Sequence, residues 1–143
     1  VQEEPRGTAQ ALLSAREAVC AALGATPDRE GRRHFLMCNA DNLYTAGAVA
    51  ELVDARGPSL IAYDADALVR EGGLDPERVR RFALLDIAAD DVLTDLVEKP
   101  EPGHPLLART PVWVSMNLWR FSDAIFDACA DVTPSARGEL ELA

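Results

Sequence analysis

Two charged side chains follow segments that predict strands. Asp41 closely follows the short apolar run His34–Cys38, and Lys99 comes directly after the predicted strand Val92–Glu98. A carboxylate at such a place has little solvent, and Mg²⁺ would offset the cost of its burial. A lysine there is a compact point charge that suits a phosphate. Each pattern has an ordinary alternative: Asp41 also suits an Asx turn or a helix cap, and Glu98 and Lys99 suit a surface pair.

The lysine is unusual for a second reason. The chain has thirteen arginines and this one lysine, so we expect a role that arginine cannot fill, with compositional chance as the alternative. Pro100 biases the residue before it toward an extended backbone, which would project Lys99 from the strand end. Glu98 can accept hydrogen bonds from hydroxyl groups.

Two further segments suit a ligand. Gly7 and Thr8 open a helix-like repeat, where glycine lets a ligand approach the backbone and the helix start offers free amides. In the alternating segment Pro111–Phe121, Ser115 and Asn117 share one side with aromatic rings. That mixture suits a sugar. The alternatives are an ordinary helix start and a packed core with a few satisfied polar groups.

The composition excludes several kinds of function. The 143 residues carry a net charge of −10, which argues against a nucleic-acid surface. No apolar run is long enough for a bilayer, and no signal peptide opens the chain, so we expect a cytoplasmic protein without a membrane partner. The odd number of cysteines, without metal-ligand spacing, predicts buried free thiols in a reducing compartment. The three cysteines are Cys20, Cys38 and Cys129. We assign no role to either histidine, His34 or His104.

Helix-like and strand-like segments alternate in the first half, which favours a parallel sheet with helices on both faces. Strands dominate the second half, so we expect an α/β, Rossmann-like three-layer sandwich with a mixed, mostly parallel sheet. Ligands bind at the carboxyl ends of strands in such sheets, so Asp41, Lys99 and Asn117 should face one cleft. The predicted helices span 8–23, 46–55 and 65–70, with another starting at Asp75-Pro76 and a last one capped by Ser122 and running to about 130. The predicted strands span 34–38, 59–63, 82–87, 92–98 and 111–121.

The order of the motifs is more informative than any one of them. The chain resembles the sugar-1-phosphate nucleotidyltransferases, the family of glucose-1-phosphate thymidylyltransferase, ADP-glucose pyrophosphorylase and mannose-1-phosphate guanylyltransferase. The resemblance covers nearly the whole chain. The motifs that carry it, in chain order, are Gly7-Thr8-Ala9, Asn39-Ala40-Asp41-Asn42, Phe82-Ala83, Glu98-Lys99-Pro100, Ser115-Met116-Asn117 and Arg137-Gly138-Glu139.

The resemblance implies a reaction and a set of site residues. The reaction joins a nucleoside monophosphate, taken from a nucleoside triphosphate, to a sugar 1-phosphate and releases pyrophosphate, with Mg²⁺ as cofactor. The resemblance implies that Asp41 binds the metal and that Lys99 holds the sugar phosphate. Ala83 and Asn117 stand where relatives often have glycine. The implied nucleotide contacts are Gln2, Gly7 and Thr8, and the implied sugar contacts are Ala83, Glu98, Asn117 and Glu139.

Some family features are missing from the chain. It has neither the glycine-rich loop that holds the triphosphate nor the C-terminal aspartate that shares the metal. It also begins at Val1 without a methionine and stops inside an alternating pattern, so we expect one domain, residues 1–143, incomplete at both ends and inactive alone. Two alternatives stay open: a non-catalytic regulatory or assembly subunit of the same fold, and an unrelated nucleotide-binding module. Assembly into a homo-oligomer is also left open.

Overall fold

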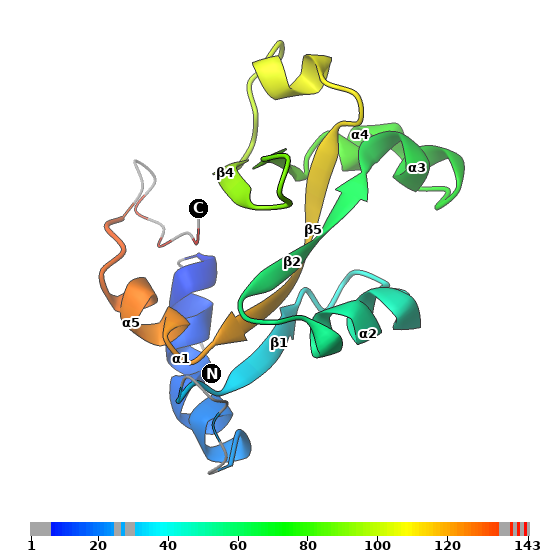
Figure 1. Ribbon diagram of the computed structural model, residues 1–143. Coiled ribbons are helices and arrows are strands. Elements are labelled where there is room, and N and C mark those ends of the chain that lie inside the picture. The colour runs from blue at the N-terminus through cyan, green and yellow to red at the C-terminus, as the bar shows by residue number, and fades with distance from the viewer. Residues whose placement is uncertain are drawn as a thin grey trace. The chain divides into compact units, whose positions relative to one another are not determined.

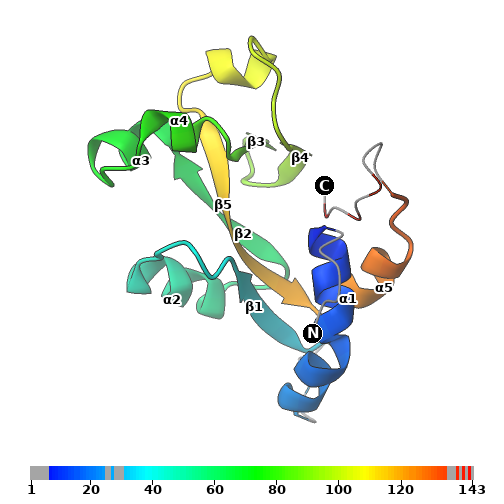
Figure 2. The ribbon, with the colours of Figure 1, turned by 180° about the vertical axis from the view of Figure 1, so that it is seen from behind.

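The computed structural model describes residues 7–24, 27, 31–134, 138, 140 and 142. Helices and strands alternate along these residues, which makes the protein α/β (Figures 1 and 2). The elements, in chain order, are α1 (Thr8–Ala22), β1 (His34–Cys38), α2 (Ala46–Asp54), β2 (Ser59–Asp64), α3 (Ala65–Arg70), α4 (Pro76–Val79), β3 (Ala83–Ile87), β4 (Leu93–Val97), the 3₁₀ helix η1 (Pro105–Ala108), β5 (Trp113–Ser122) and α5 (Ile125–Ala130).

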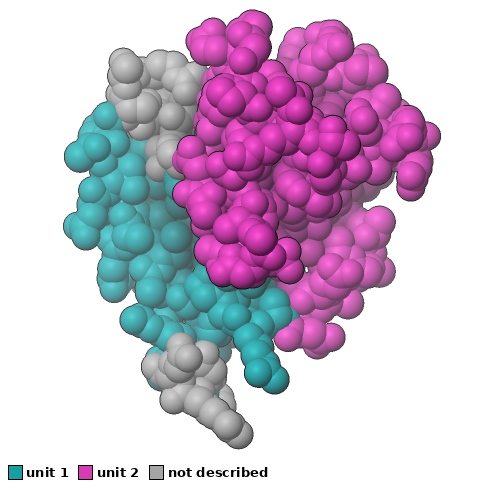
Figure 3. Space-filling model, turned by 45° about the horizontal axis from the view of Figure 1, so that its top comes forward, with its two compact units in different colours: residues 1–36, 55–59, 120–142 teal, residues 37–54, 60–119, 143 magenta. Residues whose placement is uncertain are grey.

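The chain divides into two compact units, which Figure 3 colours separately. Unit 1 comprises Val1–Leu36, Ala55–Ser59 and Arg120–Leu142. Unit 2 comprises Met37–Asp54, Leu60–Trp119 and Ala143. No helix in the described part of the chain is long and apolar enough to span a bilayer.

The strands of the described residues form a five-stranded sheet in the order β1-β5-β3-β4, with β2 also paired to β5. The pairing of β3 with β4 is antiparallel, and so is that of β3 with β5. The mostly parallel sheet that we expected is therefore not confirmed. A parallel pair needs a crossover of a dozen or more residues, whereas the connection from β3 to β4 is a tight turn in which the Ala88 amide donates to the Val92 carbonyl.

Local sequence signals account for most element boundaries. Gly24, with φ 64°, ends α1 as expected, because glycine adopts the left-handed region without a steric cost. Asp64 and Asp75 cap α3 and α4, and each carboxylate accepts hydrogen bonds from backbone amides of the first turn. The expected Ser122 cap is wrong: Ser122 is the last residue of β5, and α5 begins after Ala124 without a side-chain cap.

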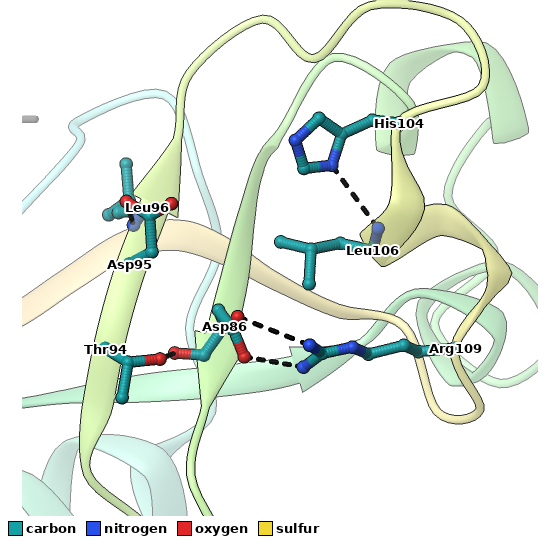
Figure 4. Close-up of polar contacts among 7 residues, drawn as sticks. All are labelled: Asp86, Thr94, Asp95, Leu96, His104, Leu106 and Arg109. Carbon is teal, nitrogen blue, oxygen red and sulfur yellow. Dashed lines mark hydrogen bonds and ion pairs between the residues drawn. The ribbon is translucent and has the colours of Figure 1, made fainter.

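The core of unit 2 lies between β3, β5 and η1. Leu84, Leu106 and Val114 are almost fully buried there, with Tyr63 and Phe82 among the side chains packed against them. A two-fold polar contact joins β3 to the residue after η1, because Arg109 Nη1 and Nη2 donate to the two Asp86 carboxylate oxygens (Figure 4). The Asp95 carboxylate stands opposite Asp86 in the register, so Arg109 also offsets a like-charge pair.

In unit 1, α1 and α5 lie side by side (Figures 1 and 2). The Arg16 guanidinium joins them: it donates to Asp127 at 3.2 Å and lies 5.8 Å from the centre of the Phe126 ring. The Phe126 ring in turn stacks on Phe35 of β1 at 5.5 Å. Aromatic and cation–π contacts therefore supplement apolar burial in this unit.

All three cysteines are free, but only one is fully buried. Burial raises the pKa of the Cys129 thiol. Cys20 is half-buried, and Cys38 is exposed because it ends β1, where the chain leaves the sheet. The prediction of buried thiols is thus confirmed for Cys129 and wrong for Cys38.

Arg33 and Asp123 form a partly buried ion pair in unit 1, with Arg33 Nε donating to Asp123 Oδ2 at 3.0 Å. The hydrogen bond from Arg33 is the main reason that the pKa of Asp123 lies below its ordinary value. A lowered folded-state pKa gives stability that is complete above the ordinary aspartate pKa and is lost as the pH falls through the folded value.

We expect Arg33→Met to lower the free energy of unfolding by roughly 1–2 kcal/mol at neutral pH, the size of one hydrogen bond to a charged group. The difference from the wild type should shrink below about pH 4, as Asp123 protonates. Urea unfolding between pH 3 and pH 7 measures both effects. The control is Arg80→Met, which removes the exposed pair with Glu77 and should cost less, about 0.2–1 kcal/mol. A cost for Arg33→Met that does not change with pH would contradict the assignment.

Candidate functional site

The loop between β1 and α2 carries Asp41 and is closed by one hydroxyl group. The Tyr44 Oη accepts from the Asn39 amide at 3.1 Å and from Asn42 Nδ2 at 3.3 Å. It also donates to the Met116 carbonyl of β5 at 2.8 Å. A tyrosine hydroxyl has one proton and two acceptor positions, so these three bonds satisfy it completely.

Asn42 makes a second attachment to the same carbonyl. Its Nδ2 donates to the Met116 carbonyl oxygen at 3.1 Å, and its Oδ1 accepts from Arg78 Nη2 at 2.8 Å. The loop is therefore held by β5 on one side and by α4 on the other. The partners also decide the orientation of the amide, because only the nitrogen can donate and only the oxygen can accept.

Asp41 lies on the turn of this loop and is exposed. The prediction that its carboxylate has little solvent is therefore wrong, because the chain has already left the sheet at Cys38 and turns outward. Among the described residues, none donates a hydrogen bond to this carboxylate, and no group of three His, Cys, Asp or Glu side chains could hold a metal ion. Mg²⁺ uses one or two protein carboxylates and fills its other positions with phosphate oxygens and water. Asp41 fits that role as a single protein ligand.

Glu98 and Lys99 follow the end of β4 and are both exposed. Lys99 has φ 49°, so the extended backbone expected before Pro100 is wrong. The chain bends at Glu98 and Lys99 as it leaves the edge of the sheet, and this bend requires the left-handed region. That conformation costs a residue other than glycine about 1–2 kcal/mol. No described side chain forms an ion pair with the Lys99 ammonium group, which leaves its charge available.

Asn117 lies in the middle of β5 and has φ 58°. Its amide donates to Ser115 Oγ at 3.1 Å, and its Oδ1 accepts from Trp119 Nε1 at 3.4 Å. The regular alternation expected along this strand is broken here, since Ser115 and Met116 are both buried. Asparagine tolerates the left-handed region better than other side chains do, although glycine is the usual choice.

Among the described residues, three other than glycine have positive φ: Asp91, Lys99 and Asn117. Two of the three are candidate site residues. Strained backbone of this kind tends to gather at functional sites. The strain thus supports these two positions independently of their side-chain chemistry.

The sheet register brings the sugar-side candidates together in unit 2. Ala83 pairs with Ser115, two residues before Asn117. Val97 pairs with Leu84, so Glu98 comes next to Ala83 where β4 ends. Ala83 is 5% exposed, and its small side chain keeps this end of β3 close to its neighbours.

The nucleotide-side candidates belong to unit 1. Gly7, with φ 102°, has the Leu140 carbonyl oxygen only 2.3 Å from where a Cβ would lie. The Ala9 amide donates to that carbonyl at 2.9 Å, and the Leu142 amide donates to Thr8 Oγ1 at 3.1 Å. Leu140 and Leu142 therefore occupy part of this helix start. Gln2 and Glu139 lie outside the described residues, and the nucleotide contacts stay a prediction.

Sequence reasoning missed two residues of this site, Tyr44 and Arg78. An aromatic residue with a polar tip, directly after the polar Asn39–Asn42 segment, was a signal for Tyr44. Arg78 had no comparable signal, because it meets Asn42 only through the packing of α4.

Tyr44→Phe removes one hydroxyl and three hydrogen bonds, so we expect it to lower the free energy of unfolding by about 1–3 kcal/mol. Urea unfolding followed by tryptophan fluorescence measures the change. Tyr63→Phe is the matched control, because the Tyr63 hydroxyl is buried with no hydrogen-bond partner among the described residues. Its removal should be neutral or stabilising. Equal losses in both variants would show that the Tyr44 bonds do not hold the loop.

Comparison with known proteins supports the family that these motifs indicate. Residues 1–143 match the family described as Nucleotidyl transferase. The low-salt glycan biosynthesis nucleotidyltransferase Agl11 of Haloferax volcanii is 31% identical over 121 residues, which cover 85% of this chain and 30% of that protein. The UTP–glucose-1-phosphate uridylyltransferase AglF of the same organism is 28% identical over 141 residues, covering 99% of this chain and 49% of that protein.

The chain thus spans half or less of the length of these relatives. The match nevertheless extends over every motif named above, from Gly7 to Glu139. The resemblance inferred from the order of the motifs is confirmed, and the chain belongs to the nucleotidyl transferase family.

Proposed function

We propose that the full-length protein transfers a nucleoside monophosphate from a nucleoside triphosphate to a sugar 1-phosphate and releases pyrophosphate. Family membership supports nucleotidyl transfer, and the relative AglF is a UTP–glucose-1-phosphate uridylyltransferase. The observation that carries the proposal is the attachment of the Asp41 loop to Met116 of β5, in the unit that also holds Lys99.

For this reaction the protein has to position the two substrates and to stabilise their negative charge. An oxygen of the sugar phosphate forms a bond to the α-phosphorus, and the bond from that phosphorus to the bridging oxygen breaks. The electron pair of the broken bond leaves with pyrophosphate. The nucleophile is already an anion, so no side chain has to remove a proton.

Each site residue then has a defined task. Mg²⁺, held by Asp41, would neutralise charge on the α-phosphate oxygens. Lys99 offsets the repulsion between two polyanions and aligns the attacking phosphate. Glu98 accepts hydrogen bonds from sugar hydroxyls, with Ala83 and Asn117 forming the wall beside them. In the same proposal, Gln2, Gly7 and Thr8 contact the nucleotide, and Glu139 contacts the sugar.

A screen of the full-length protein for pyrophosphate release, across nucleoside triphosphates and sugar 1-phosphates with Mg²⁺, tests this function. Release from at least one pair supports the proposal. Binding of a nucleotide sugar without release from any pair would instead indicate a non-catalytic subunit. No binding and no release would overturn the assignment.

With an active pair in hand, Asp41→Asn should lower kcat by at least about 10³-fold, because it removes the charge that holds the metal without changing the side-chain shape. Steady-state kinetics at saturating Mg²⁺ measures the change. Asp90→Asn is the matched control, an exposed aspartate in the turn after β3, and should keep wild-type kcat. Similar activities of the two variants would exclude Asp41 as the metal ligand.

Lys99→Ala should raise KM for the sugar phosphate by about 10–100-fold, the loss expected for one charged hydrogen bond. KM for the nucleotide should change by less than about threefold. Lys99→Arg keeps the charge on a longer, forked side chain and should fall between the two. Small and equal changes in both KM values would place Lys99 outside the sugar-phosphate site.

A further inference from the structure

The Arg78 side chain of α4 reaches the Asp41 loop. Its Nη2 donates to Asn42 Oδ1 at 2.8 Å across 36 positions of sequence. Asn42 Nδ2 donates to the Met116 carbonyl and to the Tyr44 hydroxyl. Arg78 therefore completes a set of bonds that fixes both ends of the Asn42 amide.

The neighbouring arginine of the same helix end behaves differently. Arg80 pairs with Glu77 within one turn of α4, and both side chains are largely exposed. Arg78 has no carboxylate partner among the residues that the structure describes, and it donates to a neutral oxygen instead. The Arg78 charge is therefore not neutralised by a nearby carboxylate, and its hydrogen bond orients the Asn42 amide. We infer that this bond contributes more to the orientation of the loop than to the free energy of unfolding.

The amide that Arg78 orients is adjacent to Asp41 in the chain. The loop is closed from Asn39 to Tyr44, so the direction of the exposed Asp41 carboxylate depends on how Asn42 is held. Without Arg78, Asn42 keeps its bonds to Met116 and Tyr44 but loses the partner of its oxygen. The α4 helix also leads through residues 80–82 into Ala83, the start of β3, so Arg78 links the metal side of the site to its sugar side.

We propose that Arg78 is a positioning residue that acts through Asn42 to hold the Asp41 carboxylate in its metal-binding orientation. This inference rests on the proposed function, since it gives Asp41 the metal-ligand role. Residues that orient a metal ligand from behind typically contribute 10–100-fold to metal affinity or activity. A misplacement of about 1 Å is enough for such a loss.

The test compares Arg78→Ala, Arg78→Lys, Asn42→Ala and the double variant Arg78→Ala/Asn42→Ala in the full-length protein, with Arg80→Ala as the matched control. We expect Arg78→Ala to lower kcat about 10-fold and leave KM for the sugar phosphate within about twofold. Arg78→Lys should recover most of the activity, because an ammonium group can also donate to Asn42 Oδ1. The double variant should be no worse than Asn42→Ala, since both changes remove one pathway.

A second measurement does not depend on turnover. Mn²⁺ affinity, measured by electron paramagnetic resonance, should fall about 10-fold in Arg78→Ala and stay unchanged in Arg80→Ala. A wild type that releases no pyrophosphate but shows this difference would overturn the proposed reaction and keep the role of Arg78. Equal Mn²⁺ affinities, additive losses in the double variant, or a wild type that binds no Mn²⁺ would overturn the role of Arg78.

Discussion

The carbonyl group of Met116 is the interaction on which the candidate site depends. The Tyr44 hydroxyl and the Asn42 side-chain amide both donate to this carbonyl, so one oxygen of β5 holds the Asp41 loop through two hydrogen bonds. Asn117, the next residue, takes a left-handed conformation that is braced by Ser115 and Trp119. A polar loop is thus attached to a buried strand at the point where that strand departs from regular geometry, and each partner limits the freedom of the other.

The local signals in the sequence predicted the bounds of most helices and strands closely. They did not predict how the strands pair. His34–Cys38 matches the predicted strand at both ends, and Ala46–Asp54 differs from its prediction by one residue. Periodicity and caps report on a few neighbouring residues, whereas strand direction depends on what each connection can span. The predicted strands 82–87 and 92–98 leave only four residues between them, too few for a parallel crossover, and the structure closes this connection with a hydrogen bond from the Ala88 amide to the Val92 carbonyl.

The candidate site shows the same division between local and distant information. The motifs identified the family and placed Asp41 and Lys99 just after strand ends, because residue type and spacing are local properties. The same expectation was wrong for Asn117, which lies in the middle of β5. The predictions of a buried Asp41 and an extended Lys99 were wrong. Both properties depend on where the chain turns after it leaves the sheet. Arg78 could not be predicted, because its bond to Asn42 joins residues 36 positions apart.

The acidity of the chain makes the placement of its few available cations decisive. A net charge of −10 repels phosphates at long range, so an anion has to be attracted by groups close to it. Several arginines are already committed to carboxylates, as Arg33 is to Asp123 and Arg109 is to Asp86. Salt screens the repulsion between charges that are more than about 10 Å apart but leaves contacts inside a site largely intact. A polyanion near so acidic a chain therefore depends on close cations whose charge no carboxylate balances, and among the described residues of unit 2 Lys99 and Arg78 are such cations.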